Sequence, residues 1–161
     1  MLTIRTAQAA DLSAVLKIFA HARVFMKQTG NTQQWGDHWP PKEVLQDDIV
    51  RQRLYVVEAD SIVHGAFAIV SGDEPTYAVI HDGAWLSNAP YVTIHRVASD
   101  GTVRGIFKEI VSFCAVRHPH LRIDTHADNH VMQHLILKNG FQQCGIIDVE
   151  DGSTRIAYEK L

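Results

Sequence analysis

Residues 91–117, YVTIHRVASDGTVRGIFKEIVSFCAVR, decide the fold of this chain. Tyr91–Ala98 is rich in β-branched and apolar residues and contains no Gly or Pro, which predicts a strand. A loop with Gly101 and Gly105 follows, and apolar residues recur at helical spacing from Ile106. A strand that turns into a helix in this way leaves backbone N–H groups free at the helix N-terminus, where they can bind an anion. The segment therefore predicts an anion site, although ordinary turn glycines would give the same pattern.

Outward from this unit, the chain alternates between extended and helical patterns. We expect helices that begin at Asp11, Lys42 and Ile106, and a fourth that is capped by Asp128 and ends at Lys138. We expect strands at 2–5, 54–58, 62–70, 91–98, 121–125, 141–147 and 153–159, with a further short strand at 76–80. This order predicts one domain of the α/β class, with a single mixed, mainly antiparallel sheet and helices on both faces.

The composition excludes several classes of protein. The 161 residues are 46% hydrophobic and 20% charged, which is ordinary for one globular domain. The formal net charge is −3 and no basic run occurs, so we expect no nucleic-acid partner. The beginning of the sequence is too polar for a signal peptide and no apolar run reaches membrane-spanning length, so we expect a cytoplasmic protein without a membrane partner. The sequence leaves the oligomeric state open, and a homodimer is compatible with it.

The cysteines Cys114 and Cys144 match no zinc spacing and form no disulfide framework. Cys114 lies in an apolar helical run and Cys144 in a strand-like run. We expect both to be buried, reduced thiols.

Two segments downstream of the first unit carry a family resemblance. LRIDT (121–125) is followed by HADNHVMQHLILKNGF (126–141), a helix that begins at an Asn and ends in Asn-Gly-Phe. Together with IRTAQAADLSAVLKIF (4–19) and HRVASDGTVRG (95–105), they resemble the GNAT superfamily of acyl-CoA-dependent N-acetyltransferases over nearly the whole chain. The resemblance implies that the fourth and fifth strands splay apart and admit the pantetheine arm of acetyl-CoA. It also implies transfer of an acetyl group to a small-molecule or peptide amine.

The same resemblance implies a set of coenzyme-binding residues. The exposed edge of the fourth strand would bind pantetheine much as an added strand does, and amides of the following loop would hold the pyrophosphate. The implied residues are Arg96, Val97 and Ala98 on the edge, Thr102, Val103, Arg104, Gly105 and Ile106 in the loop, and Asn129 at the start of the later helix.

Two features depart from the family pattern. The family loop reads Gln/Arg-x-x-Gly-x-Gly/Ala, whereas Asp100 stands first here and Val103 replaces the middle Gly. Because backbone N–H groups do most of the binding, Val103 is compatible with the site if its φ stays negative, and Arg104 restores a positive charge. Many members also place a Tyr four residues before the Gly-Phe pair, where it protonates the departing thiolate. Ile136 occupies that position here.

His95 is the candidate catalytic residue. It lies beside the implied pantetheine edge, where family members often place residues that relay a proton from the amine. An imidazole suits a general base at neutral pH. The alternative is a strand histidine held by hydrogen bonds. Strand alternation would put His95 and Arg96 on opposite faces, so we expect only one of them to face the reacting centre.

Trp35, His38 and Trp39 are the candidate acceptor-binding residues. They follow the first helix, in a segment that lines the acceptor cleft in the family. Aromatic side chains can wall a pocket and attract a cationic amine. The alternative is that they pack the connection between helices onto the core.

Two other functions fit parts of the sequence. A non-catalytic acyl-CoA-binding or sensor protein on the same fold would share the altered loop and the missing Tyr. A histidine metalloprotein would use His126, His130 and His134, which lie four residues apart, but the Glu of the HExxH motif is absent. We expect no metal.

Overall fold

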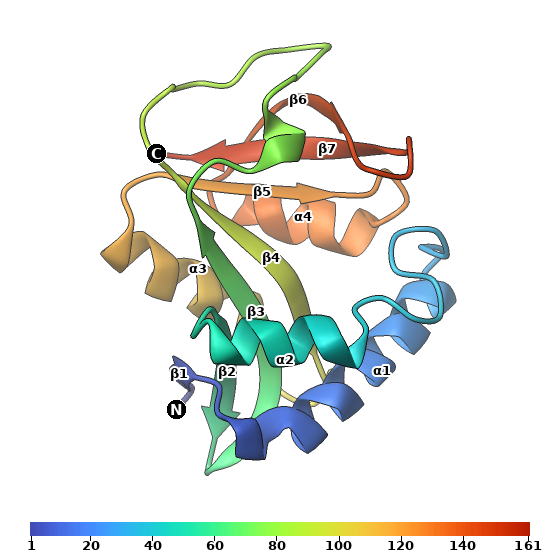
Figure 1. The fold of residues 1–161 in the computed structure, drawn as a ribbon, viewed down its shortest axis with the longest axis vertical. Helices are drawn as coiled ribbons and strands as arrows, with labels where there is room; N and C mark the ends of the chain where they lie inside the picture. The colour runs from blue at the N-terminus through green and yellow to red at the C-terminus, as the bar shows by residue number, and fades with distance from the viewer.

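The structure is a computed structural model that describes residues 1–161. Seven strands, four α-helices and two short 3-10 helices follow one another along the chain (Figure 1). The elements are β1 Thr3–Thr6, η1 Ala9–Asp11, α1 Leu12–Gln28, α2 Lys42–Val50, β2 Leu54–Ala59, β3 Ile62–Ser71, η2 Pro75–Tyr77, β4 Val92–Ser99, α3 Ile106–Arg117, β5 Leu121–Thr125, α4 His130–Lys138, β6 Gln142–Asp148 and β7 Thr154–Lys160.

The strands form a single sheet in the order β1-β2-β3-β4-β5-β7-β6. All neighbours are antiparallel except β4 and β5, which are parallel. Their pairing is limited to Val92 with Leu121 and Thr93 with Arg122. Beyond Thr93 the two strands diverge, so the expected mixed sheet with splayed fourth and fifth strands is confirmed.

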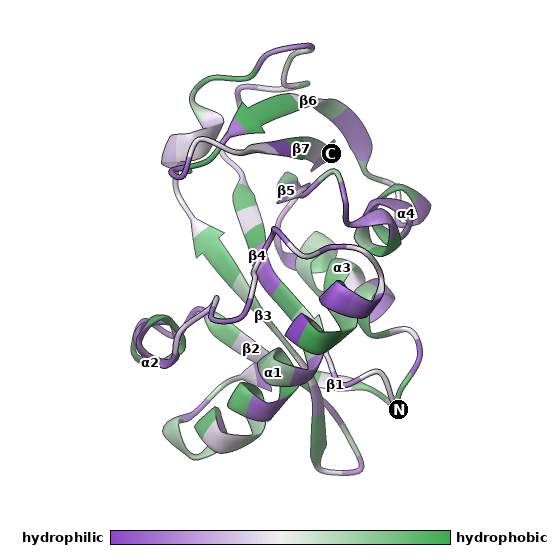
Figure 2. Ribbon diagram, turned by 90° about the vertical axis from the view of Figure 1, so that its right-hand side faces the viewer, coloured by the Kyte–Doolittle hydropathy of each residue, from purple (hydrophilic) through white to green (hydrophobic).

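Helices cover both faces of the sheet, as expected. In Figure 1, α1 and α2 lie in front of the β1–β4 half, whereas α3 and α4 lie behind the sheet. Figure 2, turned by 90°, shows the strands between these two layers. The α1–α2 side has a core of 11 buried residues that includes Phe19 and Leu45, and the α3–α4 side has a core of 15 that includes Ile110 and Tyr158. Apolar stripes on the helices therefore fix which face each helix covers.

The connection between β3 and β4 covers the part of the sheet that α1 and α2 leave open. Arg122 on β5 and Glu159 on β7 are buried beneath it and form an ion pair of 2.8 Å. The Arg122 guanidinium lies over the rings of Trp85 and Tyr91 and donates to the Ser87 carbonyl. Buried polar contacts thus hold this connection against the sheet.

The expected strand at 76–80 is wrong. The segment begins in the 3-10 helix Pro75–Tyr77 instead, and the Glu74 side chain accepts from the Thr76 amide at its start. Pro75 occupies the first turn, where its missing N–H costs nothing. The Tyr77 side chain turns into the protein, where its hydroxyl donates to Asp124 at 2.6 Å.

Two smaller expectations have different outcomes. Asn129, not Asp128, caps α4, because its side chain accepts from the Met132 amide at 3.0 Å.

Both cysteines are free and buried, as expected. Burial raises the pKa of the Cys114 thiol to about 12 and that of Cys144 to about 11, so both are protonated and unreactive at neutral pH. None of the helices has the length and hydropathy needed to cross a lipid bilayer.

Candidate active site

A β-bulge in β4 shapes the centre of the molecule. Ala66 of β3 pairs with Ala98 and Ala68 pairs with His95, so Arg96 and Val97 both lie opposite Phe67. Arg96 has a φ of 54°, in the left-handed region. A bulge bends a strand and interrupts its ladder. Here it lies where β4 has already parted from β5, so backbone groups along this edge are free for a ligand.

The Arg96 side chain binds a buried carboxylate. Its Nε and Nη2 donate to the two carboxylate oxygens of Asp48 on α2, at 2.8 and 3.0 Å. Arg53 donates to the same carboxylate at 2.7 Å, and Asp48 is completely buried. The two-point contact with Asp48 fixes the unusual backbone of the bulge.

The bulge also removes the reason for expecting only one of His95 and Arg96 to face the reacting centre. An extra residue in the strand breaks its alternation. The His95 ring contacts Glu74 in the β3–β4 connection and Arg96 contacts α2, and both residues line the same cavity.

His95 and Glu74 form a pair in this cavity. Nε2 of His95 lies 3.3 Å from a carboxylate oxygen of Glu74, whose other oxygen accepts from the Thr76 hydroxyl at 3.0 Å. The hydrogen bond with His95 lowers the pKa of Glu74 to about 2, so Glu74 is ionised at neutral pH. An ionised carboxylate only accepts, so Nε2 is the donor and the neutral ring has a free acceptor at Nδ1. The pair can therefore orient a histidine base.

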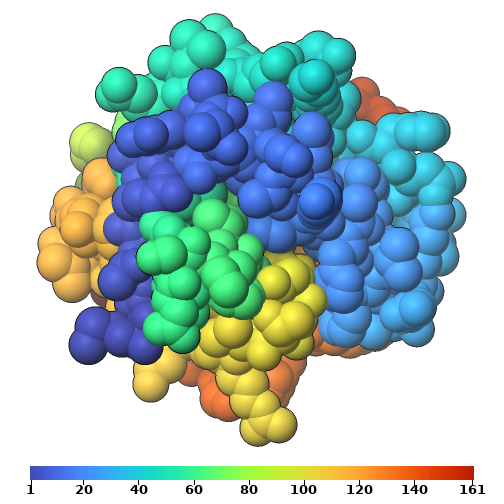
Figure 3. All heavy atoms as spheres, turned by 90° about the horizontal axis from the view of Figure 1, so that it is seen from below, coloured from blue at the N-terminus to red at the C-terminus, as the bar shows by residue number.

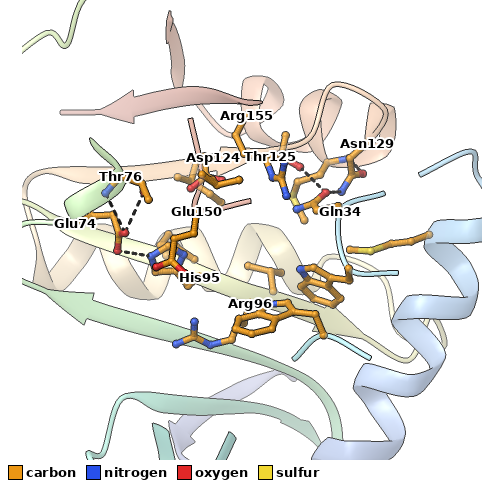
Figure 4. Close-up of a pocket in the computed structure, with 18 of the residues that line it drawn as sticks. Gln34, Glu74, Thr76, His95, Arg96, Asp124, Thr125, Asn129, Glu150 and Arg155 are labelled. Atoms are coloured by element: carbon orange, nitrogen blue, oxygen red, sulfur yellow. Dashed lines mark hydrogen bonds and ion pairs between the residues drawn. The ribbon is translucent and has the colours of Figure 1, made fainter. Parts of the chain in front are cut away.

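A cavity of about 510 Å³ opens beside this pair (Figure 4). Residues from segments between α1 and β7 line it, and several are charged. The polar and charged members include Gln34, Glu74, Thr76, His95, Arg96, Asp124, Thr125, Asn129, Glu150, Asp151 and Arg155. Its volume suits a small molecule.

The three predicted acceptor-binding residues take different positions. Trp35 and Trp39 line the cavity, whereas His38 is exposed and does not. Trp35 also packs on Phe19 of α1, with ring centroids 5.5 Å apart. Trp35 thus lines the cavity and also packs onto the core, so both interpretations considered from the sequence apply to it.

Gln34 is a site residue that the sequence analysis missed. Its side-chain oxygen accepts from Asn31 and Asn129, both at 3.0 Å, and from the Thr125 hydroxyl at 3.3 Å. These hydrogen bonds connect the loop after α1 to the end of β5 and the start of α4. Its place in the NTQQW segment, next to Trp35, was the only sequence signal for it.

The loop after β4 presents a row of free amides. Those of residues 103–108 donate to no group of the protein. Gly105 directly precedes α3 with a φ of 82°, in the left-handed region that favours glycine. Val103 keeps a negative φ, so its side chain is compatible with the loop. The loop and the helix N-terminus together form a site that can bind an anion.

Asp100 is turned away from this row of amides. Its carboxylate binds Nδ1 of His64 at 2.8 Å and accepts from the amide and hydroxyl of Thr102, at 3.0 and 2.7 Å. Hydrogen bonds with Thr102 and His64 lower the pKa of Asp100 despite partial burial. The Thr102 amide is therefore occupied within the protein, unlike the other four amides that the resemblance implied.

A second cavity, of about 400 Å³, runs along this loop. Among the predicted coenzyme residues, Val97, Ala98, Val103, Gly105, Ile106 and Asn129 line it, whereas Arg96, Thr102 and Arg104 do not. Figure 3 shows the loop (yellow) on the surface beside α1 (blue), whose His21, Ala22 and Phe25 form the opposite wall. Met26, Val97, Asn129 and Met132 line both cavities. The two cavities therefore meet at the bulge of β4.

The remaining positions singled out from the sequence lie apart from this junction. Ile136 is fully buried in the α3–α4 core. His130 and His134 are exposed on α4, and the chain contains no group of three His, Cys, Asp or Glu side chains arranged to hold a metal ion.

Comparisons with known proteins identify the family. No protein-family model and no curated protein matches the sequence. Among solved structures, a GNAT-family acetyltransferase from Streptococcus agalactiae is 30% identical over 99% of this chain and 95% of that chain, with a TM-score of 0.91. The chain belongs to the GNAT family of acetyltransferases.

More distant structures share the GNAT fold. A GNAT-family acetyltransferase from Listeria monocytogenes is 18% identical over 99% of this chain and 94% of that chain, with a TM-score of 0.72. A protein from Salmonella typhimurium, solved with its cofactor acetyl-CoA, is 19% identical over 98% of this chain and 92% of that chain, with a TM-score of 0.64. The family and fold expected from the sequence are thus confirmed.

Proposed function

We propose that this chain is an N-acetyltransferase that moves the acetyl group of acetyl-CoA to an amine by direct attack. The observation that carries the proposal is the meeting of the two cavities at the β4 bulge. One cavity ends in free backbone amides that suit a pyrophosphate, and the other contains a histidine with a free ring nitrogen. A thioester in the first would meet an amine in the second at Val97.

In this mechanism each part of the site has a distinct task. Glu74 holds Nε2–H of His95, and Nδ1 takes the proton from the acceptor ammonium, directly or through water. The neutral amine attacks the thioester carbonyl, and strand amides near Val97 stabilise the charge that develops on the oxygen. The two cavities hold both reactants in line, which contributes much of the rate. Because Ile136 offers no proton, the departing thiolate takes its proton through water, which in turn accepts the second proton of the attacking nitrogen.

The acid residues of the acceptor cavity favour a cationic amine. Glu74, Asp124, Glu150 and Asp151 line it, and the indole rings of Trp35 and Trp39 add faces that attract cations. A protonated amine is the usual form at neutral pH and would be drawn in before it loses its proton.

A non-catalytic acyl-CoA-binding protein on the same fold is the second candidate. Burial of Ile136 at the position of the usual tyrosine favours it, because no tyrosine there can serve as proton donor.

Two measurements on the purified chain test the proposal. Acetyl-CoA should raise the melting temperature, since it binds only the folded state. Free thiol should then be released from acetyl-CoA when an amine panel is added. Absence of a thermal shift at millimolar acetyl-CoA would contradict the coenzyme assignment. A shift without thiol release for any amine would favour the non-catalytic candidate.

A further inference from the structure

Arg155 is a buried cation that points into the acceptor cavity. It lies near the start of β7 and is only 8% exposed. Figure 4 shows its side chain reaching into the cavity on the side of Gln34 and Thr125. Thr125 at the end of β5 pairs with Ile156, the neighbour of Arg155, and both Thr125 and Arg155 line the cavity.

The guanidinium of Arg155 has one nitrogen engaged and two free. Nη1 donates to the Ser153 hydroxyl and to the Thr154 carbonyl, both at 2.9 Å. The Ser153 hydroxyl in turn donates to Oδ1 of Asp151 at 2.5 Å. The chain of hydrogen bonds that begins at Nη1 of Arg155 therefore ends on the Asp151 carboxylate. Nε and Nη2 donate to no atom of the protein, although together they form the two-donor edge that fits a carboxylate.

Two other arginines in the protein interior use this same edge. Nε and Nη2 of Arg96 bind Asp48, and Nε of Arg122 binds Glu159 while its Nη2 donates to the Ser87 carbonyl. Asp48 and Glu159 are fully buried. Arg155 alone among these three has no carboxylate partner. Burying an unpaired charge is costly, so its free edge is the place where an anionic ligand would be stabilised.

The opposite side of the cavity has the reverse charge. Glu74 lies there with His95, and Figure 4 shows Glu150 on the same side. Glu150 is exposed and forms no ion pair, whereas Asp151 and Asp124 accept from Ser153 and Tyr77. The cavity therefore offers carboxylates next to the proposed base and, at Arg155, a cation whose Nε–Nη2 edge is free and whose Nη1 is joined to Asp151 through Ser153.

We infer that the acceptor is an amine that also carries a carboxylate, as in an α-amino acid, with its carboxylate on the Nε–Nη2 edge of Arg155. This inference rests on the proposed acetyl transfer. The ammonium group lies toward His95 and the carboxylate toward Arg155 and Thr125. The nearby acid residues favour a singly charged carboxylate over a doubly charged phosphate, because like charges repel. In the reaction the ammonium nitrogen first gives one proton to His95 and then forms a bond to the acetyl carbon; the carbon–sulfur bond breaks, and the second proton of the nitrogen passes through water to the departing thiolate.

The test compares each of the twenty L-amino acids with its α-carboxamide, which keeps the amine and removes the negative charge. Thiol release from acetyl-CoA measures transfer, and calorimetric titration in the presence of coenzyme A measures binding without reaction. The amide has the less basic amine, so it would be the better nucleophile at neutral pH if the carboxylate were not recognised. We expect at least one amino acid to be bound and acetylated at least tenfold better than its amide.

Variants at Arg155 test whether this residue causes the preference for the amino acid over its carboxamide. Arg155→Gln should lower the ratio of acid to amide kcat/KM at least tenfold, and Arg155→Lys should restore part of that ratio. Arg117→Gln is the matched control, because Arg117 lies at the exposed end of α3, away from both cavities. Denaturant melts of all variants exclude unfolding as the cause.

The remaining outcomes separate this inference from the proposed function. Equal use of acids and amides, an equal loss of both in Arg155→Gln, or no binding of any amino acid would overturn the carboxylate site. Transfer to simple amines alone would do the same and leave acetyl transfer intact. Binding of an amino acid that depends on Arg155, without thiol release, would support the site and contradict the proposed transfer.

Discussion

The two cavities that meet at Val97 are built in different ways. The cavity along the β4–α3 loop presents backbone amides at the start of α3, and apolar side chains of α1 and α4 complete its walls, whereas the side chains of Thr102 and Arg104 are exposed outside it. The acceptor cavity presents side chains, and these come from α1, the α1–α2 loop, the β3–β4 connection, β4, β5, the start of α4, the β6–β7 turn and β7. A backbone site depends on local chain geometry and tolerates varied side chains. A side-chain site depends on tertiary contacts and changes with each residue.

The largest difference between effects on the two cavities is expected from a substitution at His95. His95→Gln should lower kcat/KM for the acceptor at least a hundredfold, in line with loss of a general base, and leave the Kd of acetyl-CoA unchanged. His118→Gln is the control, since His118 lies at the end of α3 outside both cavities. Steady-state kinetics and coenzyme titration of both variants measure the difference. A parallel loss of coenzyme affinity would show that His95 supports the loop instead.

The pH profile gives the same variant a second readout. In the wild type, log(kcat/KM) should rise with pH to a plateau as the base loses its proton. Glu74 has a pKa of about 2, so it is ionised throughout this range and adds no step. The step should vanish in His95→Gln, while titration of the acceptor amine persists at higher pH. An unchanged profile would return His95 to a structural role.

A smaller effect, on the other cavity, is expected at Gly105. A Cβ at this position would meet no protein atom within 4 Å, but the φ of 82° is strained for any other residue. Gly105→Val should therefore distort the amide row and weaken acetyl-CoA binding at least tenfold, about 1.4 kcal/mol. The apolar stripe of α3 should keep the protein folded.

Gly152 provides a matched control for this change. It has a φ of 84° and equally open surroundings, but it lies in the β6–β7 turn. Gly152→Val should lose a similar amount of stability in denaturant melts while its coenzyme affinity stays normal. Normal affinity in Gly105→Val would mean that the pyrophosphate does not bind this loop.

The smallest effect is expected at Arg104. Its side chain is exposed and lines neither cavity, so a nearby phosphate would gain little from its screened charge. Arg104→Ala should change the Kd of acetyl-CoA less than about threefold. A tenfold loss in a direct titration would show that the coenzyme side also depends on side chains.

Sequence reasoning succeeded where a signal is local. The segment from Val92 to Arg117 has the predicted strand, loop and helix, because residue pattern and glycine positions act within a few residues. It failed at 76–80, where β-branched residues suggested a strand but Pro75 and the Glu74 cap produced a 3-10 turn. It also missed the bulge that breaks the alternation between His95 and Arg96, because no residue pattern in this strand predicts one.

The acceptor cavity was the least predictable part. Trp35 and Trp39 were expected there, but Gln34, Glu74 and Arg155 were missed. Each of these three is an ordinary polar residue in its own segment. Glu74 is 21 residues from His95, and Gln34 is 95 residues from Asn129, its partner at 3.0 Å. Their roles arise only from contacts across the sheet.

The sequence by itself determined most of the elements and the loop that can bind a phosphate, and its motifs carry the family resemblance. The elements and the loop follow from hydrophobic periodicity, glycine positions and free amides at a helix start, which are properties of a continuous segment. Only the tertiary structure decided that His95 is paired with Glu74, that Asp48 holds the bulge through Arg96, and that Arg155 has a free edge in the acceptor cavity. The reason is that charge pairing depends on distances between side chains, and those distances are set when the splayed sheet and its covering segments pack together.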